Sequence, residues 1–187
     1  METEIKEWLQ KIKVHGIGDY KFLDQIPIIN AVISSVPLSS LNEYMRVIMI
    51  KLFLRLAIGI GFLSAVADRF GFWSKEVSAW GNWDNFIAYT QSLNPMAPLS
   101  MIPFIGWTST LLEIVFGLCL IIGFKTSFIA KWSGWLLLIF ALAMTFTRGI
   151  KAPLDYSVFA ASAGAFALSL IKEKFLELDT LLKKNKE

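Results

Sequence analysis

One acidic residue stands alone inside a long apolar stretch of this sequence. Glu113 is the only charged residue between positions 102 and 124. A charge at such depth in a bilayer costs about 2.5–3.5 kcal/mol or more, so it usually faces a pathway, a pocket or a partner. Two interpretations follow. Glu113 belongs to a binding site, or it pairs with a buried cation and fixes the register of the helices.

Further ionisable residues are expected at the same end of the helices as Glu113. Asp68 ends the first apolar stretch, and Arg148 and Lys151 lie between the third and fourth. We predict that Arg148 lies within reach of Glu113. The charges then bind an anion or a polar headgroup together, or they only neutralise one another. Pro153 suits a first helical position, which would place Asp155 in a first turn, where a carboxylate favours the helix dipole.

Composition indicates the solvent in which these residues lie. Of the 187 residues, 55% are hydrophobic and only 18% are charged, and the mean hydropathy is +0.56. Soluble domains have about 45–50% apolar and about 25% charged residues. Charged residues concentrate in the first 46 and last 16 positions, which predicts a lipid bilayer as partner and no nucleic acid. One cysteine and one histidine cannot form the usual zinc, iron–sulfur or bis-His haem sites, so no metal is expected.

Hydropathy predicts an all-α membrane protein with a four-transmembrane-helix bundle. The expected spans are about 47–67, 102–124, 132–147 and 156–171 within a membrane domain of residues 47–171. Residues 1–46 are predicted to be a cytoplasmic or interfacial helical extension, and residues 172–187 a basic cytoplasmic tail. Within the extension, residues 4–13 have the apolar spacing of an amphipathic helix, and residues 26–36 are apolar but too short to span.

The distribution of Lys and Arg predicts the orientation. With both termini in the cytoplasm, thirteen basic residues lie inside and four lie outside, which satisfies the positive-inside rule. The inner set is Lys6, Lys11, Lys13, Lys21, Arg46, Lys51, Lys125, Lys131, Lys172, Lys174, Lys183, Lys184 and Lys186, and the outer set is Arg69, Lys75, Arg148 and Lys151.

Small residues at helical spacing predict which helix faces pack together. The expected inward stripes are Ala57, Gly61, Ser64 and Asp68 in the first span; Ser109, Glu113 and Gly117 in the second; and Ser157, Ala161 and Gly164 in the fourth. The connection over residues 68–101 is long and rich in tryptophan, with a short helix expected after Asn82. We predict that it lies along the outer membrane surface, as an aromatic belt or as a lid over the bundle.

Several motifs, in order, resemble those of the DoxX family of four-span bacterial membrane proteins. They are residues 55–73 (RLAIGIGFLSAVADRFGFW), 81–89 (GNWDNFIAY), 113–117 followed by 123–126, and 151–157 (KAPLDYS), within a match over about residues 53–171. The resemblance implies a four-helix bundle in the cytoplasmic (inner) membrane. Some members are similar to the membrane subunit of thiosulfate:quinone oxidoreductase. Many relatives end the first span with Gly and Lys where this chain has Ala67, Asp68 and Arg69, so we do not expect the thiosulfate reaction to transfer.

These observations lead to a functional hypothesis with two alternatives. The chain is expected to be a redox-associated membrane subunit that binds quinone or a similar lipid-soluble molecule at the outer end of the bundle, with a redox protein or a second copy as partner. The alternatives are a non-enzymatic accessory or scaffold subunit and a small transporter, and the sequence leaves open whether the chain is an enzyme. No catalytic residue is assigned. The candidate ligand-binding residues are Glu113, Asp68, Arg148, Lys151, Asp155, Tyr156, Trp83 and Tyr89.

Overall fold

The computed structural model describes residues 38–179, and all regular structure in this range is helical. The predicted amphipathic helix over residues 4–13 and the apolar segment over residues 26–36 lie outside the described residues. The elements are α3 (Leu38–Arg69), α4 (Trp83–Leu93), the 3-10 helix η2 (Leu99–Met101), α5 (Ile102–Ile122), α6 (Thr126–Arg148), α7 (Lys151–Asp155) and α8 (Val158–Leu170). The predicted all-α class is confirmed.

Three helical segments are long and apolar enough to cross a membrane. They are Asn42–Arg69, Leu99–Ile122 and Thr126–Arg148, with 28, 24 and 23 residues. At 1.5 Å per residue they measure about 34–42 Å, which exceeds a hydrocarbon layer of about 30 Å. Only about a third of each apolar window is buried inside the chain, and large apolar side chains such as Phe53 and Phe146 point outward. A helix that is apolar on its outer face suits lipid rather than water, which points to a membrane protein.

The third long helix begins six residues before its predicted start. The sequence predicts a span from residue 132, whereas α6 begins at Thr126. Gly123 and Lys125 adopt left-handed conformations, with φ of 74° and 44°, so the chain reverses in a very short link. Ile129 and Ala130 are buried, so packing extends the helix past the charge of Lys131, which stays exposed.

The predicted fourth span is interrupted near its start. Ser157 has a φ of 54° and separates α7 from α8, so no single helix covers residues 156–171. Pro153 lies inside α7 and Asp155 is its last residue. The expectation that Asp155 stands in the first turn of a span is therefore wrong. The 13 residues of α8 measure about 20 Å, which is shorter than a hydrocarbon layer.

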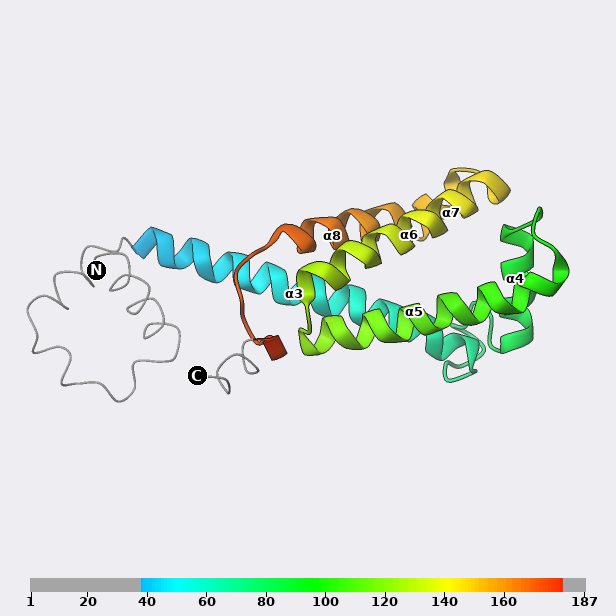
Figure 1. The fold of residues 1–187 in the computed structure, drawn as a ribbon, viewed down its shortest axis with the longest axis horizontal. Coiled ribbons are helices and arrows are strands. Elements are labelled where there is room, and N and C mark those ends of the chain that lie inside the picture. The colour runs from blue at the N-terminus through cyan, green and yellow to red at the C-terminus, as the bar shows by residue number, and fades with distance from the viewer. Residues whose placement is uncertain (1–37, 180–187) are drawn as a thin grey trace, which may run out of the picture. The chain divides into compact units, whose positions relative to one another are not determined.

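The core of this region lies mainly between α6 and α8, which run side by side in opposite directions (Figure 1). Ala130, Leu136, Ala165 and Leu168 are buried there in one apolar cluster. The Ser162 hydroxyl donates a hydrogen bond of 2.8 Å across the interface to the carbonyl oxygen of residue 134. Such a polar contact adds direction to packing that is otherwise apolar.

Close approach between α3 and α5 depends on two glycines. A Cβ atom on Gly117 would lie 3.0 Å from the carbonyl oxygen of Gly59, so a larger residue would force the helices apart. In α5 the predicted stripe is largely right, because Glu113 and Gly117 are buried. In α3 it is wrong at Ala57 and Gly61, which are exposed while the next residues, Ile58 and Phe62, are buried, and it is right at Asp68, which is buried.

The buried face of α8 is also displaced from its predicted stripe. Ser162, Ala165 and Leu168 are buried, whereas the predicted Ala161 and Gly164 are only partly covered. One residue corresponds to a rotation of about 100° around a helix axis. Small residues therefore identify the helices that pack closely, but they do not fix which face each helix presents.

Candidate functional site

The partner of Glu113 is Arg69, the last residue of α3. Glu113 is 1% exposed and Arg69 is 3% exposed. The Nη2 atom of Arg69 donates to both carboxylate oxygens, at 2.7 and 2.8 Å. Its Nη1 atom donates to the Thr110 hydroxyl at 2.7 Å, and that hydroxyl donates to the carbonyl oxygen of Gly106 at 2.8 Å. The predicted pairing of Glu113 with Arg148 is therefore wrong.

Two aromatic rings cover the guanidinium group of Arg69. Its central carbon lies 4.0 Å from the ring centre of Phe86 and 5.4 Å from that of Trp80. Rings at these distances attract a cation through their π faces. Helix α4, which supplies Phe86, lies tightly against α5, because a Cβ atom on Gly106 would be only 2.6 Å from Ile87. The ion pair is therefore enclosed by α3, α4 and α5.

Asp68 shapes the loop that brings Trp80 over Arg69. Its carboxylate accepts hydrogen bonds from the backbone N–H groups of Ala79 and Trp80, at 3.0 and 2.9 Å, and from the Ser78 hydroxyl. Asp68 is 6% exposed, so these bonds form away from most of the solvent. Adjacent residues thus have separate roles: Asp68 holds the loop, and Arg69 binds α5.

The beginning of α4 is set by a local cap. The Asn82 side chain accepts a hydrogen bond of 2.8 Å from the backbone N–H of Asn85, so the helix begins at Trp83. An asparagine in this position satisfies one of the free N–H groups of the first turn. The cap therefore places Trp83 and Phe86 on the first two turns of α4, beside Arg69 and α5.

A cluster of aromatic rings borders the enclosed ion pair. The rings of Trp83 and Trp107 lie 4.2 Å apart, and Phe70 stacks on Trp83 at 5.7 Å. Phe70 and Trp107 are about half exposed, so the cluster presents aromatic surface to the outside of the chain. Trp83 connects this surface to the buried pair because its ring also lies 5.4 Å from that of Phe86.

Arg148 and Tyr89 form a separate contact. The guanidinium of Arg148 donates to the Ser92 hydroxyl at 2.8 Å and lies 4.7 Å from the ring centre of Tyr89. Burial raises the pKa of the Tyr89 phenol above its ordinary value, although the charge of Arg148 acts in the opposite direction. Arg148 therefore ties α6 to α4 and takes no part in the pair with Glu113.

The remaining candidates lie on the surface. Lys151 and Asp155 form an ion pair with each other, one turn apart on α7, and both side chains are exposed. Tyr156 is 72% exposed. Exposed pairs of this kind contribute at most about 1 kcal/mol to stability. The structure brings together Glu113, Asp68 and Trp83, and it leaves Lys151, Asp155 and Tyr156 outside that group.

Sequence reasoning missed Arg69, Thr110 and Phe86 as members of this site. Thr110 had a usable signal, because it lies three residues before Glu113 on the same helical face. Arg69 follows the last apolar residues of α3, and the count of basic residues assigned it to the outer surface. That count treats every terminal cation as solvated, so it does not detect one that turns inward toward a carboxylate.

One donor of Arg69 is unused. Its Nε atom is buried and has no hydrogen-bond partner among the described residues, although both Nη atoms are bonded. A buried donor left without an acceptor costs about 1–3 kcal/mol. A surface cavity of about 360 Å³ is lined by residues between Ala88 and Leu99, at the end of α4 and in the loop after it. Neither Arg69 nor Glu113 lines this cavity, so it does not reach the unused donor.

Comparison of the chain with protein-family models, with curated proteins and with solved structures finds no match. The resemblance to the DoxX family therefore stays a prediction. Within residues 38–179, no group of three or more His, Cys, Asp or Glu side chains is placed to hold a metal ion.

Proposed function

We propose that this protein is a DoxX-like, redox-associated membrane subunit that binds quinone or a similar lipid-soluble molecule beside the Arg69–Glu113 pair. The observation that carries the proposal is the unused Nε–H of Arg69, buried beneath aromatic rings where the end of α3 meets α4 and the middle of α5. A quinone carbonyl is an acceptor that matches this donor. Its flat ring suits the surface of Phe70, Trp83 and Trp107, because aromatic rings stack well on one another.

Electron transfer in such a subunit would use the bound quinone and a partner chain, because quinones carry electrons as diffusible organic cofactors. The protein's own contribution would be to position the ring and to supply hydrogen bonds. Glu113 binds the Nη2 atom of Arg69, whereas the proposed quinone carbonyl binds its Nε atom. The charge of Glu113 would therefore hold Arg69 in place without contacting the quinone. Binding would require a small displacement of the loop at Trp80, since the pair is enclosed.

The proposal includes four spans with both termini in the cytoplasm of a bacterial cell. Helix α8 would serve as the fourth span together with the residues on either side of it, because 13 residues alone fall short of the hydrocarbon layer. In this topology the tryptophan-rich segment lies outside. Cysteines at Ser92 and Asn185, each in a Cys119→Ser background, test it. Impermeant thiol reagents should label the first in intact cells and the second only in opened cells, and the reverse pattern contradicts the orientation.

The binding proposal is tested with a short-chain ubiquinone and tryptophan fluorescence. Arg69→Lys keeps a cation for Glu113 but removes the Nε–H, so quinone should still quench the tryptophans with a dissociation constant about tenfold higher. Arg148→Lys changes the same residue type outside the site and serves as the matched control. Equal affinity in Arg69→Lys and wild type would place the ligand elsewhere.

An accessory or scaffold role is the second candidate. It is favoured by the pairing of both Glu113 oxygens with Arg69, which engages the carboxylate within the protein in the enclosed state. In this case the pair only fixes how α3 and α5 meet. Absence of quinone quenching in the wild-type protein, together with a stable complex with another membrane protein, would favour the scaffold over the quinone site.

A further inference from the structure

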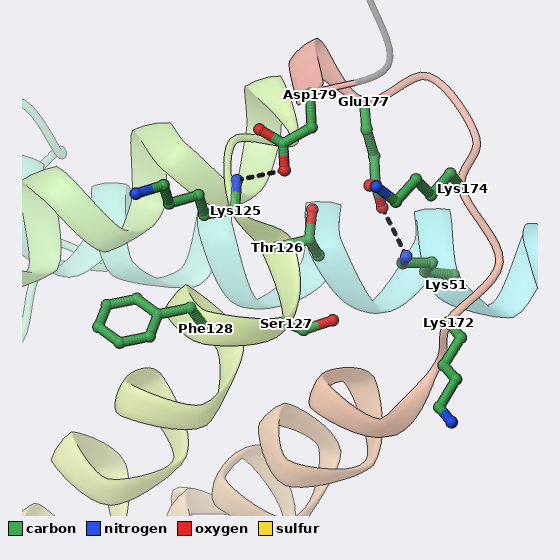
Figure 2. A pocket seen from close by; sticks show the side chains of 9 residues that line it. All are labelled: Lys51, Lys125, Thr126, Ser127, Phe128, Lys172, Lys174, Glu177 and Asp179. Carbon is green, nitrogen blue, oxygen red and sulfur yellow. Dashed lines mark hydrogen bonds and ion pairs between the residues drawn. The ribbon is translucent and has the colours of Figure 1, made fainter. Parts of the chain in front are cut away.

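A second polar site lies at the other end of α6, far from Arg148. There the chain passes from α5 to α6, and residues 171–179 return alongside this link. A cavity of about 290 Å³ lies between these segments. This volume is near the lower end of the range for small-molecule sites, about 300–1,000 Å³. Four of its nine lining residues are lysines. Figure 2 shows the side chains of Lys51 and Lys174 reaching toward Glu177, whereas those of Lys125 and Lys172 extend outward from the rim.

The cavity has more positive than negative charge. Lys51, Lys125, Lys172 and Lys174 line it with only two carboxylates, from Glu177 and Asp179. The Glu177 carboxylate pairs with Lys51 at 2.5 Å, and the Asp179 carboxylate accepts from the backbone N–H of Lys125 at 2.9 Å. Within the described part of the chain, the ammonium groups of the other three lysines form no ion pair. A net positive cavity attracts an anion.

An unpartnered hydroxyl also faces this cavity. Thr126 is 2% exposed, and its Oγ1 atom has no hydrogen-bond partner among the described residues. Figure 2 shows this hydroxyl directed into the space below Glu177 and Asp179. Polar groups buried this deeply are nearly always bonded, so the Thr126 hydroxyl is a donor that awaits an acceptor.

The position of Thr126 adds further donors. It is the first residue of α6, and no side chain caps this helix. The first N–H groups of a helix lack intrahelical partners, and the helix dipole makes this end positive. Helix N-termini with free N–H groups bind phosphate for this reason. Here the hydroxyl and the helix end lie in one cavity, and its rim carries three lysines that form no ion pair with another described residue.

The walls of the cavity are fixed before any ligand binds. The guanidinium of Arg55 donates to the carbonyl oxygens of Phe175 and Leu176, at 3.0 and 3.1 Å, and to those of the last turn of α5. Lys51 also donates to the carbonyl oxygen of Glu173 at 2.6 Å. These bonds hold the segment that carries Lys172 and Lys174 beside α5 and α6. A site that is already assembled loses less entropy when a ligand binds.

We propose that this cavity binds a phosphate group, with the Thr126 hydroxyl and the first N–H groups of α6 donating to its oxygens. Lys125, Lys172 and Lys174, on the rim of the cavity, balance the charge of the phosphate. The group is carried by an anionic phospholipid or by a water-soluble phosphate ester. Basic pockets at the ends of membrane helices bind lipid headgroups through the same contacts.

The test uses the full chain, purified in detergent and stripped of lipid. Dioleoylphosphatidylglycerol is one probe and glycerol 3-phosphate is the other, with dioleoylphosphatidylcholine, a zwitterionic lipid of zero net charge, as the reference. Native mass spectrometry measures lipid binding, and the shift in melting temperature measures binding of the soluble ester. Wild-type protein should bind at least one of the two anions more tightly than the reference. If only phosphatidylglycerol binds, the cavity is a lipid site. If only glycerol 3-phosphate binds, its ligand is a water-soluble phosphate ester.

Thr126→Val decides between a ligand site and a structural feature. Valine has nearly the same shape but no hydroxyl, so anion affinity should fall about tenfold. The melting temperature without ligand should stay equal or rise, because an unpaired buried hydroxyl has been removed. The double variant Lys172→Gln/Lys174→Gln should weaken binding similarly. Lys131→Gln, which removes an exposed lysine of α6 outside the cavity, should not change it.

Two results would overturn this proposal. One is that wild-type protein binds neither anion better than phosphatidylcholine. The other is that the threonine and lysine variants both bind with wild-type affinity. Neither result depends on the quinone proposal, because Arg69→Lys leaves this end of the molecule intact.

Discussion

Two arginines on α3 are buried at different depths of the bundle and are neutralised in different ways. Arg55 and Arg69 are 14 residues apart, which is about 21 Å along the helix. They are 1% and 3% exposed. Arg69 binds a carboxylate, that of Glu113. Arg55 instead donates to four backbone carbonyl oxygens, those of Leu120, Ile121, Phe175 and Leu176.

The difference follows from what each guanidinium meets. Arg55 meets the end of α5, where carbonyl groups have no helical partners and the dipole is negative. The carbonyls of Leu120 and Ile121 bind its Nε and Nη2 atoms, and those of Phe175 and Leu176 bind Nη1 and Nη2, so each nitrogen is bonded without a carboxylate. Arg69 meets the middle of α5, where the backbone is already bonded, so only a side chain can neutralise it. The buried cation with every nitrogen bonded is structural, whereas the one with a free Nε–H is the better candidate for binding.

Among the changes that test this comparison, Glu113→Gln is expected to lower stability the most. This change leaves Arg69 as an uncompensated buried charge, which should lower the free energy of unfolding by about 3–5 kcal/mol. Chemical unfolding in detergent, followed by circular dichroism, measures it. The double variant with Arg69→Gln should recover much of the loss. Glu113→Gln with wild-type stability would mean that the pair does not hold α3 to α5.

Replacement of Arg55 should have a somewhat smaller effect. Arg55→Met keeps an apolar chain of similar length but removes every donor to the four carbonyls. Hydrogen bonds from a charged group contribute about 1.5–3 kcal/mol, and three of the four bonds are only partly buried, so water can replace the arginine there. A loss of about 2–3 kcal/mol is therefore expected.

The Arg55 variant should also free the segment near Phe175 and Leu176. Limited proteolysis should cleave there faster than in wild type, and Arg55→Lys should restore part of the protection because a lysine can reach some of the same carbonyls. Unchanged cleavage in Arg55→Met would contradict the role given to this arginine.

A smaller effect is expected at Asp68, the neighbour of Arg69. Asp68→Asn keeps one acceptor oxygen and loses the other, so at least one of the bonds to Ser78, Ala79 and Trp80 must break. The free energy of unfolding should fall by about 1–2 kcal/mol. Because Trp80 is held by this carboxylate, the tryptophan emission should also shift to longer wavelength. A loss of stability without such a shift would argue against loop anchoring.

The smallest effect is expected at Arg148. Its contacts with Ser92 and Tyr89 are at an exposed site, so Arg148→Gln should change the free energy of unfolding by no more than about 0.5–1 kcal/mol. The measurement is the same as for Glu113→Gln, which makes Arg148 the natural reference. A loss as large as that of Glu113→Gln would restore Arg148 as a partner of the buried carboxylate.

The sequence predicts helices better than it predicts what they touch. Apolar runs located the long helices, and the depth of Glu113 marked it as a buried carboxylate that needs a partner. The identity of that partner depended on how α3 rotates against α5. Periodicity within one helix cannot determine this rotation, because Gly59 and Gly61 look alike in sequence and only Gly59 lies at the contact. Arg69 and Arg148 were equally available cations until tertiary packing placed them.

Helix boundaries were missed where the backbone takes an uncommon conformation. Lys125 and Ser157 both have positive φ values, which non-glycine residues rarely adopt, and each one marks the start of a helix. Nothing in their side chains signals this. The contacts at the start of the predicted basic tail were not foreseen either: Lys51 donates to the carbonyl oxygen of Glu173 and pairs with the carboxylate of Glu177, which composition does not show.

The bonds of Arg55 to distant carbonyls imply an order of assembly. Its partners at Phe175 and Leu176 are made 120 and 121 residues later in the chain. At about 5–20 residues per second, synthesis of that stretch takes roughly 6–24 s. During this interval a helix with two basic side chains, Lys51 and Arg55, must keep them near water or lipid headgroups. Helix α3 therefore reaches its final environment only after almost the whole described chain has been synthesised.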